Sequence, residues 1–297
     1  MGYLLLSIAL LAGVTKGYCG KKTSGYVEQL GDALSANIIR MLFCIGIGFL
    51  VVAFSGELSS LKPSPTLMLI TALSGISTSL FVVSWLLSVK KGAYMMVEVF
   101  LMLGVLVPIL LGRFFLSETV RFNQILGLGL LIVAVLLMCS YNTSVKGKIQ
   151  KTALVFLILC GLANGLTDFS QRLFVHTMTL PASVFNFYTY VFSAGTLLII
   201  SLFLKNKEVP QKDGFVANFK KIFWYILVMA LCLFANSYFK TQAATYLDST
   251  QLYPLNQGMS LILSTLMSAL LFKEKPNLKC VAGIILSFVA LLLINVL

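Results

Sequence analysis

The sequence predicts an all-α membrane protein with ten transmembrane helices arranged as a 5+5 inverted repeat. Three observations indicate this class. Of the 297 residues, 59% are hydrophobic and only 11% are charged, whereas roughly a quarter of the residues of a soluble domain are charged. The apolar residues gather in runs of about 20, the length that lets a helix cross a bilayer. The end of the second half of the chain resembles the end of the first.

Ten apolar runs follow one another with short polar connections. The strands of a membrane β-barrel would be about ten residues long and would alternate polar with apolar side chains, so helices are favoured throughout. The first run has no basic segment before it and no small-residue cleavage site after it, which favours a first helix over a signal peptide. The expected spans are 2–23, 33–54, 66–89, 92–112, 121–141, 152–174, 182–204, 221–246, 250–272 and 277–297.

Basic residues are distributed unevenly among the connections. Fifteen lysines lie at the connections after the odd-numbered spans, but only four basic residues lie at the others, namely Lys62, Arg113, Arg121 and Arg172. Because Lys and Arg favour cytoplasmic loops, this count places the odd-numbered connections in the cytoplasm and both termini outside. It also explains most of the formal net charge of +12 without a nucleic-acid partner.

An offset of 156 residues aligns the last span of each half of the chain. The offset pairs Glu118 with Glu274 and Gly127 with Gly283, and each Glu precedes a span whose positive N-terminal end it is expected to cap. The chain therefore divides into repeats 1–145 and 146–297. Because each repeat has five spans, the second repeat must cross the membrane in the inverted orientation, as in secondary transporters that bind substrate near the midplane between their halves.

Two segments and one residue carry a family resemblance. The segments are Leu116-Ser117-Glu118 followed by Gly127, and Phe272-Lys273-Glu274 followed by Gly283. The residue is Arg40, near the start of the second span. Over its whole length the chain resembles the EamA-type transporters of the drug/metabolite transporter superfamily. The resemblance implies an alternating-access exporter, facilitator or exchanger for small solutes such as amino acids, sugars or nucleotide sugars. It also implies termini in the cytoplasm, the reverse of what the lysine count predicts.

Seven ionisable residues lie inside the expected spans, where they face the protein interior and indicate a functional site. They form two clusters of mixed sign, one towards each side of the membrane. Buried ion pairs are the structural alternative: Glu98 with Lys16 or Arg40, and Asp168 with Lys240 or with Arg172, four residues further along the helix. The seven are Lys16, Arg40, Glu98, Asp168, Arg172, Lys240 and Asp248.

Four cations against three anions favour an anionic or zwitterionic substrate. The related small multidrug resistance proteins couple protons to cationic drugs through a carboxylate in helix 1, and Lys16 here weakens that interpretation. Proton coupling requires a deeply placed carboxylate, and the candidates are Asp168 and Glu98. The predicted substrate-binding residues, which include polar side chains of the fourth, seventh and ninth spans, are Lys16, Arg40, Tyr94, Glu98, Asp168, Asn186, Lys240, Tyr253, Asn256 and Gln257.

The sequence thus predicts a secondary transporter in the cell membrane, acting as a monomer on a small molecule, with no cofactor and no bound metal. The ten Asp and Glu residues, the single histidine His176 and six cysteines without C-x-x-C spacing do not suggest a metal or hydrolytic site, so an enzyme is not expected. Two alternatives remain open, namely efflux of cationic amines or multiple drugs, and an uncoupled channel. Short connections and the absence of a cleavable targeting segment favour a bacterial cell membrane.

Overall fold

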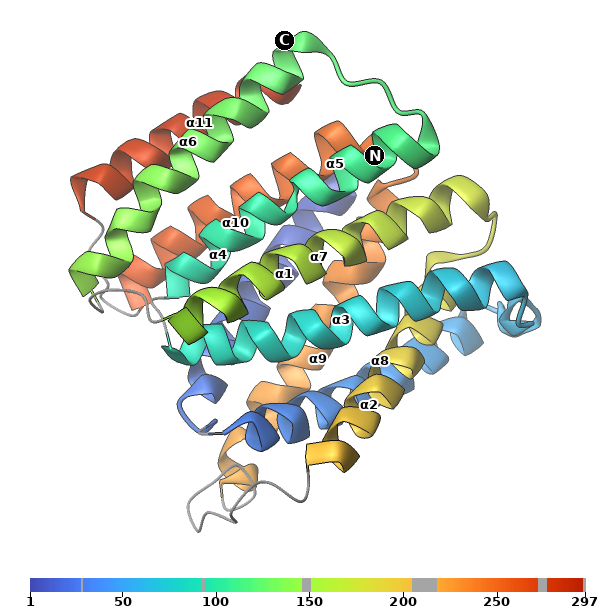
Figure 1. Cartoon of the computed structure of the whole chain (residues 1–297). Coiled ribbons are helices and arrows are strands. Elements are labelled where there is room, and N and C mark those ends of the chain that lie inside the picture. The colour runs from blue at the N-terminus through green and yellow to red at the C-terminus, as the bar shows by residue number, and fades with distance from the viewer. Residues whose placement is uncertain (28, 92–93, 146–150, 205–217, 272–276, 296–297) are drawn as a thin grey trace.

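The computed structural model describes residues 1–27, 29–91, 94–145, 151–204, 218–271 and 277–295, and this part of the chain is helical without strands (Figure 1). Each expected span coincides with a helix to within about one turn, except that the fourth is divided in two. The helices are α1 (Gly2–Ser24), α2 (Leu30–Phe54), the 3-10 helix η1 (Leu58–Leu61), α3 (Pro65–Lys91), α4 (Tyr94–Gly104), α5 (Leu106–Leu116), α6 (Phe122–Val145), α7 (Lys151–Thr177), α8 (Ala182–Leu204), α9 (Phe219–Ala243), α10 (Ser249–Leu271) and α11 (Leu278–Asn295).

The length and hydropathy of these helices identify a membrane protein. Seven stretches of the described chain are long and apolar enough to cross a bilayer: those of α1, α2, α3, α7, α8 and α9, and the combined stretch Met96–Leu116. Shorter apolar stretches lie in α6 and α11. Helix α10 has 23 residues and carries Pro254, Asn256 and Gln257 among its buried residues.

The two halves of the chain interlock along the whole bundle. Helices α6 and α11 lie together at one edge, α2 and α8 lie at the opposite edge, and the other helices fill the space between them (Figure 1). The closest packing is between halves: α1 lies along α9, and α7 lies along α3. The core of the protein is therefore mostly an interface between its two halves.

The contact between α6 and α11 is reciprocal. A Cβ atom added at Gly127 would lie 2.9 Å from the carbonyl oxygen of Ala290, and one added at Gly283 would lie 2.9 Å from that of Ala134. The offset of 156 residues pairs these same positions, Gly127 with Gly283 and Ala134 with Ala290. A contact in which each partner presents the same surface is typical of a two-fold interface.

Helices α4 and α5 are separated by a break at Val105 in the fourth span. Pro108 lacks the backbone N–H that would bond to the carbonyl of Gly104, four residues earlier, which interrupts the helical ladder. The freed Gly104 carbonyl approaches α7 closely, since a Cβ atom at Gly165 would lie 2.3 Å from its oxygen. On the same helix, a Cβ atom at Gly161 would lie 2.4 Å from the carbonyl oxygen of Phe100. Gly161 and Gly165, four residues apart on α7, therefore let the backbones of α4 and α7 come into close contact, as small residues do in other pairs of membrane helices.

Replacing Gly104 by Ala should destabilise the bundle, because the new Cβ atom would lie 2.2 Å from the carbonyl oxygen of Gly161. We expect the free energy of unfolding to fall by about 1–3 kcal/mol, the usual effect of overpacking. Thermal unfolding of the purified protein in detergent measures this. The matched control is Gly129→Ala in α6, where no atom lies within 4 Å of the added Cβ. Equal midpoints for the two variants would contradict the close approach of α4 and α7.

Candidate functional site

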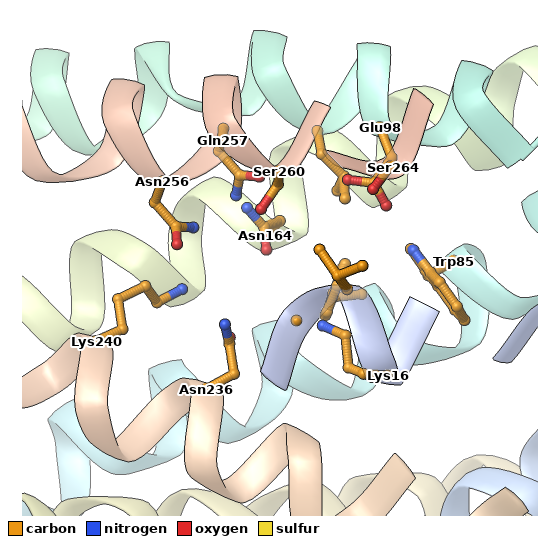
Figure 2. Close-up of a pocket in the computed structure, with 14 residues that line it drawn as sticks. Lys16, Trp85, Glu98, Asn164, Asn236, Lys240, Asn256, Gln257, Ser260 and Ser264 are labelled. Carbon is orange, nitrogen blue, oxygen red and sulfur yellow. The ribbon is translucent and has the colours of Figure 1, made fainter. Parts of the chain in front are cut away.

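A cavity with an empty volume of about 430 Å³, including its open part, lies midway along the bundle between the two halves. Figure 2 shows polar side chains from several helices pointing into the same space. The first half contributes residues of α1, α3 and α4, and the second half contributes residues of α7, α9 and α10. The lining residues are Gly13, Val14, Lys16, Phe81, Trp85, Glu98, Leu101, Asn164, Asn236, Lys240, Asn256, Gln257, Ser260 and Ser264.

Lys16 of α1 reaches the cavity beside an aromatic wall. Its ammonium nitrogen lies 5.4 Å from the centre of the Phe81 ring, close enough for a cation–π contact. Trp85, one helical turn further along α3, is 2% exposed. Gly20 makes room for its indole ring, because a Cβ atom there would lie 2.2 Å from a ring carbon. The structure gives the Lys16 ammonium no hydrogen bond or ion pair with a described residue.

Lys240 of α9 lines the same cavity but has a carboxylate partner. Its Nζ lies 2.5 Å from Oδ1 of Asp168 in α7, with side-chain exposures of 6% and 0%. Asn164 Nδ2 donates to the other carboxylate oxygen at 3.3 Å, and the Tyr253 hydroxyl donates to the backbone carbonyl of Asp168 at 2.6 Å. These bonds tie α7 to α9 and α10 directly behind the cavity.

Of the two partners expected for Asp168, the structure selects Lys240 and not Arg172. Arg172 lies one turn nearer the end of α7, where its Nε is 2.5 Å from Oε1 of Glu118 and its Nη2 is 2.9 Å from Oδ1 of Asp248. Its Nη1 also donates to the carbonyl oxygens of Ala244 and Leu247. Arg172 therefore joins the α5–α6 and α9–α10 connections at one end of the bundle.

The expected capping role of Glu118 is corrected by the same contacts. Its Oε1 binds Arg172, and its Oε2 has no hydrogen-bond partner among the described residues. At the start of α6, Gln124 Oε1 accepts from the backbone N–H of Arg121, the residue before the helix, at 2.9 Å. Ser117 has a positive φ of 55°, a conformation that turns the chain back after α5. Glu274, the repeat partner of Glu118, lies outside the described residues.

The structure places the ten predicted substrate-binding residues at different depths. Lys16, Glu98, Lys240, Asn256 and Gln257 line the cavity. Asp168 and Tyr253 lie directly behind the lining, joined to each other and to Lys240. Helix α4 begins at Tyr94, but its side chain lies outside the described part.

Two predicted residues are buried elsewhere in the bundle. Arg40 of α2 is 2% exposed, and its Nε has no hydrogen-bond partner among the described residues. Asn186 of α8 is fully buried; its Oδ1 accepts from the Ser237 hydroxyl at 2.5 Å, and Ser237 accepts from Gln171 Nε2 at 3.0 Å. Asn186 thus belongs to a polar contact between α7, α8 and α9.

The lining also includes polar residues that the sequence analysis did not select, and each lies one or two helical turns from a residue that it did select. Asn164 precedes Asp168 by four positions, Asn236 precedes Lys240 by four, and Ser260 and Ser264 follow Asn256 by four and eight. Residues four apart share a helix face. Following each predicted residue along its helix face for up to two turns would therefore have found them.

The comparisons with known proteins agree with this architecture. The model of the EamA-like transporter family matches the chain twice, at residues 1–140 and 151–296. The chain belongs to the EamA-like transporter family. A solved structure described only as "Crystal structure of protein" is similar to it, with a TM-score of 0.68, 14% sequence identity, and coverage of 98% of this chain and 95% of that one. At this identity the likeness shows the fold alone. No curated protein matches the chain.

The chemistry of the cavity is that of binding a polar solute. It combines two ammonium groups, a carboxylate, four amides and two hydroxyls with a lipid-facing exterior. Within the described ranges no group of three or more His, Cys, Asp or Glu residues could hold a metal ion. Such a cavity can replace the water around a charged small molecule.

Breaking the buried pair should destabilise the protein. Asp168→Asn or Lys240→Gln leaves the other charge without its partner, which typically costs about 3–5 kcal/mol. The double variant leaves no unpaired charge, so its loss should be smaller than the sum of the single losses. Thermal unfolding measures all three against Lys220→Gln, an exposed lysine of the same helix α9. Strictly additive losses would show that the two groups do not interact.

Proposed function

We propose that the chain is a secondary transporter of a small polar metabolite, anionic or zwitterionic, that works by alternating access. Amino acids, sugar phosphates and nucleotide sugars belong to this class. The observation that carries the proposal is the cavity itself, which lies midway along the bundle, between the halves, and presents charges of both signs. Binding sites of secondary transporters are found at this position, and the family is one of transporters.

In this proposal all ten helical segments cross the cell membrane, with the α4–α5 pair as one segment. Residues 1–145 and 146–297 form inverted repeats. The reciprocal contacts of Gly127 and Gly283 and the matched pairings of α1 with α9 and α7 with α3 support a two-fold relation between them. One chain supplies both halves of the pathway, so a monomer suffices, and transport requires no cofactor, nucleic acid or covalent step on the solute.

Alternating access requires a closure on each side of the cavity that opens in turn. The structure has two successive layers of ionic contacts towards the end of α7: Asp168 with Lys240, and one turn beyond it Arg172 with Glu118 and Asp248. Glu118 belongs to the first half, and the other members of the outer layer belong to the second. Arg172 and its partners are therefore the proposed closure on this side. Asp168 and Glu98 are the proposed proton-coupling carboxylates.

Two other functions are disfavoured by particular observations. Efflux of cationic amines would bring a positive ligand against Lys16 and Lys240, which both line the cavity. An uncoupled channel needs a continuous opening, whereas the ionic contacts of Arg172 join both halves across one end of the bundle.

Counterflow in liposomes tests the proposed function. Purified protein is reconstituted into vesicles loaded with one unlabelled amino acid, glucose 6-phosphate or UDP-glucose, and uptake of the labelled form is followed. A carrier gives a transient overshoot above equilibrium with at least one solute, because the internal solute drives exchange. A channel gives simple equilibration. Lys220→Gln should keep the overshoot, and equilibration without overshoot for every permeant solute would exclude a carrier.

The proposed closure is tested by labelling a cysteine in the cavity. Ser260→Cys is introduced into a chain whose six native cysteines are replaced, and an impermeant thiol reagent is added from the side of the α5–α6 connection. Glu118→Gln combined with Asp248→Asn removes both carboxylate partners of Arg172, so labelling should rise several-fold. Lys62→Gln, an exposed change outside this cluster, should leave labelling unchanged. Unchanged labelling in the double variant would contradict the closure.

A further inference from the structure

We infer that Lys16, and not Lys240, binds the anionic group of the substrate, and that the substrate is a small carboxylic acid with a neighbouring amino or hydroxyl group. This inference rests on the proposed function and narrows its substrate class. The observation behind it is an asymmetry between the two lysines that line the cavity.

The ammonium of Lys240 is already paired. It lies 2.5 Å from Asp168, almost fully buried, and a ligand that took this position would leave the Asp168 carboxylate unpaired in the interior. Such an exchange is unfavourable, because a buried charge without a partner is among the most destabilising features of a protein. Lys240 therefore holds α9 against α7, and its charge is not available to the solute.

The ammonium of Lys16 is in the opposite situation. It faces the cavity, contacts the Phe81 ring, and makes no hydrogen bond or ion pair with a described residue, although an ammonium has three N–H groups to donate. Glu98 and Lys240 line the same cavity. An anion at Lys16 would accept charge-assisted hydrogen bonds that the protein itself does not supply.

The charge balance indicates a single negative charge on the group bound at Lys16. The Lys240–Asp168 pair is neutral as a unit, which leaves Lys16 and Glu98 as the other charged groups of the cavity lining. One carboxylate at Lys16 and one donor group at Glu98 complement these two charges. A phosphate monoester carries nearly two negative charges at neutral pH, and its second charge would face Glu98 without a free cation in the cavity lining. The geometry therefore favours a carboxylate over a phosphate.

The opposite wall of the cavity supplies acceptors. Figure 2 shows Glu98 and Asn256 across the space from Lys16 and Asn236. The Oδ1 atom of Asn256 is buried and has no hydrogen-bond partner in the described structure, a condition that costs free energy until a donor arrives. A substrate with an ammonium or hydroxyl group beside its carboxylate would supply that donor. This pattern describes amino acids and hydroxy acids.

The walls limit the size of the substrate. The Trp85 ring lies against Gly20, where a Cβ atom would displace it, and it forms part of the cavity wall near Lys16. The volume of about 430 Å³ includes space that is open to solvent, so the enclosed part of the cavity is smaller than this figure. A nucleotide sugar, with a base, two sugars and two phosphates, is too large for this space.

Thermal shift of the purified protein tests the inference, because a ligand that binds only the folded state must stabilise it. The probes are the twenty amino acids, 2-hydroxy acids with the same side chains, the corresponding amino acid amides, glucose 6-phosphate and UDP-glucose. We expect stabilisation by at least one amino or hydroxy acid and none by its amide. In Lys16→Gln the affinity for that acid should fall by about tenfold or more, as for loss of a charged hydrogen bond, whereas Lys16→Arg should retain most of it. Lys22→Gln, whose ammonium lies 5.7 Å from the Tyr18 ring outside the cavity lining, is the matched control.

Stability of the empty protein gives an independent measurement. Lys16 makes no ion pair with a described residue, so Lys16→Gln should unfold closer to the wild-type temperature than Lys240→Gln. An equal loss in both would show that Lys16 is structural and would overturn the inference. Stabilisation by phosphates, by amides as strongly as by acids, or by no carboxylic acid would also overturn it. Counterflow of a phosphate or nucleotide sugar would then leave the proposed transport function standing, so the two failures are distinguishable.

Discussion

The buried ion pair between Lys240 and Asp168 is the interaction on which the rest of the site depends. Two charges have been removed from water at this point, and they are stable there only because each satisfies the other. The pair fixes α9 against α7, and the hydrogen bond from Tyr253 to the Asp168 backbone adds α10. The cavity surface between these helices follows from that arrangement. Because Asp168 neutralises the charge of Lys240, Lys16 is the lysine of the cavity lining whose charge has no ion-pair partner among the described residues.

Close backbone contact is the second constraint, and it acts between the halves. Glycines on α6, α7 and α11 leave space that carbonyl groups of the facing helices occupy. In a bilayer, where the hydrophobic effect does not drive helices together, such close approach is a main source of packing energy. The broken fourth span takes part in it, because the carbonyl that Pro108 leaves without a helical partner is the one that meets Gly165. The break between α4 and α5 in the first half of the chain thus contributes to the contact with α7 in the second half.

The sequence predicted the helices well and the site only in part. Runs of about 20 apolar residues locate helices because the bilayer thickness fixes their length. The interruption of the fourth span lies at Val105, three residues before Pro108. Interior charges identified Lys16, Glu98 and Lys240 as site residues but assigned Lys240 to a second cluster on the other side of the membrane, whereas all three line one cavity. Which charges pair depends on helix rotation and on side-chain reach, which periodicity does not contain. Arg172 has the right spacing for Asp168 on one helix, yet it reaches the connections beyond the helix end, while Lys240 arrives from another helix.

Helix α10 shows how the polar lining affects assembly of the protein. It has 23 residues, as many as α1 and α8, but it is not among the seven stretches that are apolar enough to cross a bilayer alone. Asn256, Ser260 and Ser264 recur on one of its faces, and in hydrocarbon their amide and hydroxyl groups would have no partners. That face is compatible with a membrane only after α1, α4 and the other helices around the cavity cover it. Insertion of this segment into the lipid and folding of the bundle are therefore coupled, so the polar residues of the cavity lining also affect when α10 can leave water during biogenesis.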